Sequence, residues 1–87
     1  MTNSKIEQMI RKLVSRYFKR AGEEVVTSDV IWAVYSEKQF QKFSKEERTE
    51  IVLGAVSCLE GEYALEYAME SIHDYWLEYF ADPLKAA

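Results

Sequence analysis

The side chains best suited to covalent chemistry are one cysteine, Cys58, and one histidine, His73. A thiolate nucleophile needs a base within hydrogen-bond reach and a third group that orients this base. The sequence offers no third group, and it contains no glycine-rich, serine-hydrolase or HExxH motif. Because an unpaired cysteine generally behaves as a small apolar residue, we expect Cys58 to be buried and the protein not to be an enzyme.

The motif Glu70-x-x-His73 suggests metal chemistry, since residues three apart share one edge of a helix. Carboxylate bundles that bind two metal ions use two such motifs together with two further Glu side chains. This chain has one motif, so the site would require a dimer, with Glu50 or Glu62 as a further ligand. A dimeric metal–carboxylate protein is therefore one functional alternative. The simpler interpretation is a partly exposed histidine with no metal and no cofactor.

A row of acids near the C-terminus is the most unusual pattern. Residues 60–82 hold seven acids and no Lys or Arg. Six of these acids recur at every fourth position: Glu62, Glu66, Glu70, Asp74, Glu78 and Asp82. On a helix each such step rises about 6 Å and turns about 40°, so Glu66 to Glu78 share the outward side, towards which Tyr63 and Tyr67 also point. Like charges at this spacing destabilise a helix by about 0.2–0.5 kcal/mol per pair.

This acidic row has three interpretations. It is a solvated face that keeps the protein soluble, or it pairs with basic residues of the same chain or of a second copy, or it binds a basic protein. The carboxylate spacing resembles that of charges on a nucleic-acid strand, but a net charge of −4 is modest for a mimic. We favour the binding of a basic protein.

Positive charge gathers at the opposite end of the chain. Residues 1–22 hold six bases and one acid, a net charge of +5, whereas residues 23–87 hold five bases and fourteen acids, a net charge of −9. Four of the bases form a stripe about 60° wide opposite the apolar face of a helix: Lys5, Lys12, Arg16 and Lys19. Such a stripe could neutralise phosphates, and residues 27–48 have helix–turn–helix proportions. A nucleic-acid-binding regulator that uses this basic stripe is therefore the other functional alternative. The argument against it is that the second helix of the unit starts with acids and has no set of base-reading side chains.

Four segments show helical periodicity or caps, at about 5–21, 29–36, 45–59 and 62–81. Ser4 with Glu7 and Ser44 with Glu47 have capping-box spacing. Residues 25–26 are expected to precede the second helix as a hydrophobic staple, with a cap at 27–29. Gly22, residues 60–61 and residues 82–83 mark helix ends. The fourth helix has one wide apolar face: Leu65, Ala68, Met69, Ile72, Tyr75, Trp76, Tyr79 and Phe80.

The run 30–35 is apolar on every side, which fits a buried helix or a short strand. No second strand is available to satisfy its backbone groups, so we assign it to a helix. A small bundle buries only part of such a run, which makes Trp32, together with Leu53, a candidate contact residue. The alternative is that Trp32 belongs to a central, fully buried helix.

A chain of 87 residues can bury one modest core. The sequence therefore predicts an all-α fold, a compact three- to four-helix bundle that forms a single domain over 1–87. One cysteine excludes an intramolecular disulfide, and the absence of a secretory signal and of a long apolar run leads us to expect a cytoplasmic protein with no membrane partner.

We expect a small regulator, adaptor or inhibitor that acts by stoichiometric protein–protein binding. Its partner would be another protein with a basic surface, and a homodimer is compatible with the small core. The contact residues predicted for this role are Glu66, Glu70, Asp74, Glu78, Tyr63, Tyr67 and Trp32.

Overall fold

The protein is an all-α bundle, as predicted. The computed structural model describes residues 4–23 and 25–79, the last five of them by their backbone alone, and this part of the chain contains no strand. Its four helices are α1 (Ser4–Tyr17), α2 (Val25–Ser36), α3 (Lys45–Leu59) and α4 (Leu65–Tyr79). Short 3₁₀ turns precede or follow them at Phe18–Arg20, Lys38–Phe40 and Glu62–Ala64.

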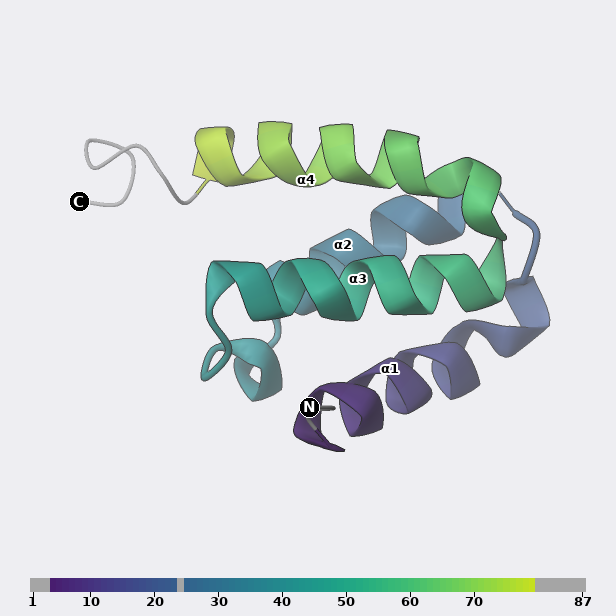
Figure 1. The fold of residues 1–87 in the computed structure, drawn as a ribbon, viewed down its shortest axis with the longest axis horizontal. Coiled ribbons are helices and arrows are strands. Elements are labelled where there is room, and N and C mark those ends of the chain that lie inside the picture. Colours follow the sequence, from purple (N-terminus) through teal and green to yellow (C-terminus); the bar gives the residue numbers. More distant parts are fainter. Residues whose placement is uncertain (1–3, 24, 80–87) are drawn as a thin grey trace.

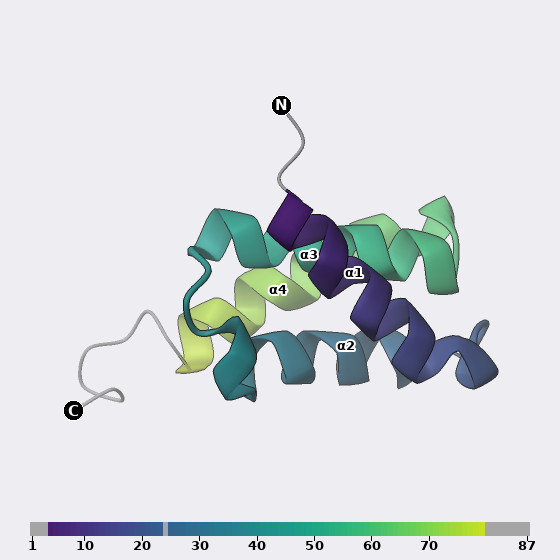
Figure 2. The ribbon, with the colours of Figure 1, turned by 90° about the horizontal axis from the view of Figure 1, so that it is seen from below.

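The helices are arranged around a central pair. α2 and α3 lie side by side and run in opposite directions, while α1 crosses one side of this pair and α4 covers the other (Figures 1 and 2). α3 packs against each of the other three helices. Consequently α1 and α4 face away from each other across the bundle.

α3 is built as a central helix. Its first turn is held by the predicted capping box, in which the Glu47 N–H donates to Ser44 Oγ (3.1 Å) and the Ser44 N–H donates to Glu47 Oε1 (2.8 Å). The apolar residues that recur along it at helical spacing are all buried: Ile51, Val52, Ala55, Val56 and Leu59. At Gly54 a Cβ atom would lie 2.5 Å from Ile10 Cδ1, so the small-sided face of α3 allows α1 to approach closely.

α2 is a helix rather than a strand, but it begins four residues before the predicted start. The expected staple and cap were wrong, because Val25, Val26 and Thr27 all belong to the helix. Thr27 is fully buried, and its hydroxyl donates to Glu60 Oε2 at 2.5 Å. Thr27 has the residue type of a helix cap, but its hydroxyl bonds to a residue far along the chain and not to a nearby backbone group.

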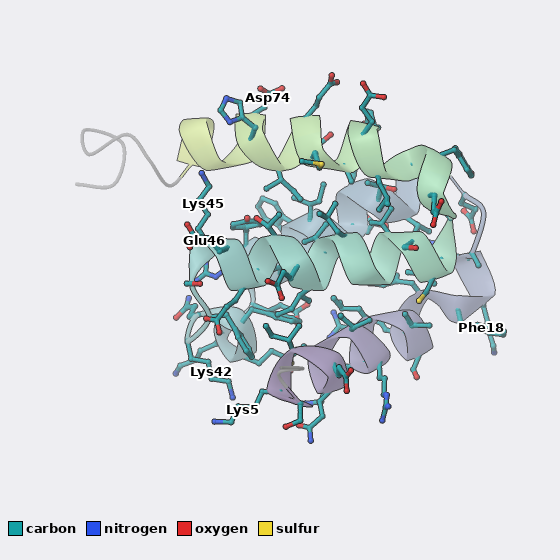
Figure 3. The ribbon with its side chains drawn as sticks, in the orientation of Figure 1. Lys5, Phe18, Lys42, Lys45, Glu46 and Asp74 are labelled. Carbon is teal, nitrogen blue, oxygen red and sulfur yellow. The ribbon has the colours of Figure 1, made fainter. Side chains whose placement is uncertain are left out.

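α1 is shorter than predicted at its C-terminal end. It begins at Ser4, so this residue is inside the helix, and α-helical geometry stops at Tyr17. The following 3₁₀ turn advances each side chain by a larger angle than an α-helix does. Phe18 therefore leaves the apolar face and is 69% exposed, pointing away from the bundle in Figure 3. Gly22 adopts φ +92° at the chain reversal, as its position predicted.

α4 follows a break at Gly61, which has φ +102°. Residues 62–64 form a 3₁₀ turn, so the α-helix starts at Leu65 rather than at 62. Its buried stripe consists of Ala64, Ala68 and Ile72, with Leu65 packed at the edge of the core. Met69 was assigned to this stripe incorrectly, since it is 56% exposed. The predicted core positions at 75, 76, 79 and 80 lie outside the side chains that the structure describes.

Candidate functional site

The side of α4 that faces away from the bundle brings together most of the predicted contact residues. Because Ala64, Ala68 and Ile72 face the core, residues two positions further along point about 200° away. Asp74 extends outward from α4 in Figure 3. We call this surface the α4 outer face; its members are all exposed: Tyr63, Glu66, Tyr67, Glu70 and Asp74. Glu78 belongs to the same predicted row, but its side chain lies outside the described residues.

The charges of the α4 outer face have no counter-charge within the described part of the chain. Glu66, Glu70 and Asp74 form no ion pair with any residue that the structure describes. The two tyrosines are unusually open, with 78% of Tyr63 and 54% of Tyr67 exposed. The face thus combines unpaired carboxylates with amphipathic rings, the residue type that most often anchors protein interfaces.

Of the three interpretations of the acidic row, pairing with the α1 stripe inside one molecule does not fit the fold. α1 and α4 lie on opposite sides of α3, so their outer faces cannot meet within one chain (Figure 1). Lys5 points away from the bundle on the α1 side and Asp74 points away on the α4 side (Figure 3). The fold therefore separates positive and negative surface by the full thickness of the bundle.

The basic stripe of α1 is exposed as predicted, but Arg16 is held by an intramolecular partner. Arg16 donates two hydrogen bonds to the Glu37 carboxylate, at 2.6 and 3.1 Å, and Gln39 Nε2 donates to the same carboxylate at 2.7 Å. The hydrogen bond from Arg16 holds the pKa of Glu37 below its ordinary value. Lys12 and Lys19 are exposed and form no ion pair with any described residue.

A second arginine, Arg20, lies outside the stripe and also forms an intramolecular ion pair. Arg20 approaches Asp29 of α2 at 2.7 Å, and this hydrogen bond raises the pKa of the guanidinium. Both Arg16 and Arg20 lie 5.8 Å from the centre of the Tyr17 ring, within the range of cation–π attraction. These contacts fasten the C-terminal end of α1, and sequence reasoning missed the two ion pairs because their acids lie in α2 or after it.

The residues considered for catalysis and metal binding do not form a joint site. Cys58 was expected to be buried, but it lies at the open edge of α3 and is exposed. His73 is exposed as well, in a shallow hollow of about 360 Å³ that it lines with Met69, Glu70 and Asp74. Among the described residues no three His, Cys, Asp or Glu side chains are grouped so that they could hold a metal ion.

The two apolar contact candidates differ from each other. Trp32 is 57% exposed on α2, although its neighbours Ile31 and Ala33 are buried. Leu53 is only partly exposed and packs against the core. Trp32 therefore offers more apolar surface to a partner than Leu53 does.

The helix–turn–helix alternative gains no support from the arrangement of α2 and α3. A recognition helix must offer one face to the DNA groove, whereas α3 packs against three helices. Arg48, one of two bases in its first turns, donates to the Phe43 carbonyl (3.0 Å) and the Gln41 carbonyl (3.1 Å). Its guanidinium therefore holds the turn before α3.

Comparisons with protein-family models, with curated proteins and with solved structures found no match for this chain. Within residues 4–23 and 25–79, no helix combines the length and the apolar character that a membrane span requires.

Proposed function

We propose that this protein acts by stoichiometric binding of another protein, which presents a basic surface to the α4 outer face. The observation that carries this proposal is the pairing of two exposed tyrosines with three carboxylates that have no counter-charge among the described residues. Complementary charges would steer the partner to this face, and Tyr63 and Tyr67 would supply the apolar contact. The protein would serve as a regulator, adaptor or inhibitor and not as an enzyme.

The destabilisation that the acidic row causes in α4 supports this proposal. Each like-charged pair four residues apart destabilises α4 by about 0.2–0.5 kcal/mol. A purely solvated helix face would gain a similar amount from alternating charges. A face that carries a single sign of charge together with exposed rings is better explained by a partner than by solubility alone.

The test is site-specific photocrosslinking followed by mass determination. A photoreactive phenylalanine derivative at position 67 is expected to trap one protein from the source lysate, and native mass spectrometry should give a fixed ratio of the two chains. The triple variant Glu66→Lys/Glu70→Lys/Asp74→Lys should lose this capture, and Tyr67→Ser should weaken it about tenfold or more.

The matched control is Glu46→Lys/Glu50→Lys, which reverses two exposed acids on α3 and should capture the partner normally. A triple α4 variant that folds and still traps the same protein would refute the α4 outer face as the binding surface. Trp32→Ala tests the second candidate: loss of capture in this variant alone would place the contact on α2.

A further inference from the structure

The face of α1 that points away from α3 is hollowed as well as basic. An open hollow of about 540 Å³ runs along it, and we call it the α1 basic hollow. Five of its lining residues come from α1 and the sixth from the 3₁₀ turn after α2: Gln8, Arg11, Lys12, Ser15, Arg16 and Gln39. Arg11 and Lys12 are exposed and form no ion pair with any residue in the described ranges. The hollow thus offers cations, amides and a hydroxyl to a ligand that carries carboxylates.

The carboxylates of the α4 outer face complement the charge of this hollow. Glu66 and Glu70 lie about one helical turn apart on α4, whereas Arg11 and Lys12 are adjacent on α1 and Arg16 is held by Glu37. When α4 of one copy lies against α1 of another, Glu66 and Glu70 can approach Arg11 and Lys12, the two cations of the hollow that form no ion pair with any described residue. Tyr63 and Tyr67 would bring ring faces to the same contact, where a guanidinium is attracted to an aromatic ring.

Nucleic acid fits the α1 basic hollow less well. Of the three cations that line the hollow, Arg16 is bound to Glu37, so only Arg11 and Lys12 are available to neutralise phosphates. Three of the six lining residues are uncharged. A row of two or three carboxylates on a helix therefore suits this hollow better than the continuous negative charge of a nucleic-acid backbone.

We infer that a second copy of this chain places its α4 outer face in the α1 basic hollow. The two faces lie on opposite sides of one molecule (Figures 1 and 3), so the contact is head-to-tail and leaves one free face of each kind. Such a heterologous contact extends into open chains rather than closing into a dimer. This inference rests on the proposed function of the α4 outer face as a docking surface, and it implies that self-association and partner capture compete for that face.

The first experiment measures mass against concentration by sedimentation equilibrium. In about 10 mM salt, where charges act over roughly 30 Å, the weight-average mass of the wild type should rise past that of a dimer without a plateau. In about 1 M salt, where the range falls to roughly 3 Å, it should stay that of a monomer. A plateau at the dimer mass, or a monomer at all concentrations in low salt, would overturn the inference.

The decisive experiment mixes two half-disabled variants. Arg11→Gln/Lys12→Gln removes cations from the hollow, and Glu66→Gln/Glu70→Gln removes carboxylates from α4. Each variant alone should associate about tenfold more weakly than the wild type, whereas the equimolar mixture should form a 1:1 heterodimer through the one intact pair of faces and grow no further. Full association of either variant alone, or no association of the mixture, contradicts the inference.

Two controls separate this inference from the alternatives. Glu46→Gln/Glu50→Gln has the same charge change as the α4 variant and should associate like the wild type. The Arg11→Gln/Lys12→Gln variant has an intact α4 outer face, so it should still capture the basic partner. If this variant loses self-association as expected but also fails to capture a partner, the proposed function has failed and the self-association has not. Binding of random duplex DNA that needs Arg11 and Lys12, with the wild type monomeric in low salt, would assign the hollow to nucleic acid instead.

Discussion

α3 and α4 are helices of equal length with opposite roles in the bundle. α3 contacts all the other helices and buries a continuous apolar stripe, whereas only Ala68 and Ile72 are buried among the side chains of α4 that the structure describes, and most of the others are exposed. α3 starts with a capping box, while the 3₁₀ turn before α4 follows Gly61 without a side-chain cap. The capping interactions are therefore found on the central helix α3, whereas α4 has exposed surface that can contact other molecules.

The largest difference between the two helices is expected from truncating one apolar side chain on each. Ile51→Ala on α3 removes a fully buried side chain and should lower the free energy of unfolding by about 2–5 kcal/mol. Met69→Ala on α4 removes one that is 56% exposed and should change it by less than about 0.5 kcal/mol. Urea denaturation of both variants measures the contrast, and equal losses would show that α4 is as deeply packed as α3.

A smaller effect tests the close approach of α1 to α3. Gly54→Val should destabilise the protein by about 1–3 kcal/mol, because even a Cβ atom would lie 2.5 Å from Ile10 Cδ1. In an Ile10→Ala background the same substitution should cost less, by roughly 1 kcal/mol, since the obstructing methyl groups are gone. A double-mutant cycle in urea gives this coupling energy. Equal losses in both backgrounds would mean that Gly54 is needed for another reason.

The smallest effects should have opposite signs on the two helices. Glu70→Gln removes two like-charged pairs from α4 and should stabilise the protein by about 0.5 kcal/mol. Glu46→Gln removes a negative charge from the first turn of α3 and should destabilise it by about 0.3–1 kcal/mol. Thermal unfolding at low salt measures both shifts, and about 1 M salt should reduce them. A loss of stability in Glu70→Gln would show that this carboxylate has a structural partner.

Features that depend on neighbours in sequence were predictable. The range of α3, its capping box and its buried stripe follow from apolar periodicity and from one Ser–Glu pair, and the structure confirms all three. The exposure of Glu66, Glu70 and the two tyrosines also follows from helical spacing once Ala68 and Ile72 define the inner side. In these cases the local pattern and the tertiary fold agree.

Features that depend on distant partners were not predictable. Thr27 has the residue type of a helix cap, and only its bond to Glu60, 33 residues away, explains its place inside α2. The Arg16–Glu37 pair spans 21 residues in the same way. Cys58 and Met69 stand at the borders of apolar faces, where a rotation of a few tens of degrees decides between core and solvent; the sequence does not specify that rotation.

The Thr27–Glu60 hydrogen bond has a companion that joins the same two corners of the bundle. The Gly22 N–H donates to the carbonyl of Leu59, the last residue of α3, at 3.1 Å. These bonds link the chain reversal between α1 and α2 to the one between α3 and α4. These links couple the two corners, so we expect amide protons on both reversals to exchange with solvent as one cooperative unit. A ligand that tightens α4 would then slow exchange at the end of α1.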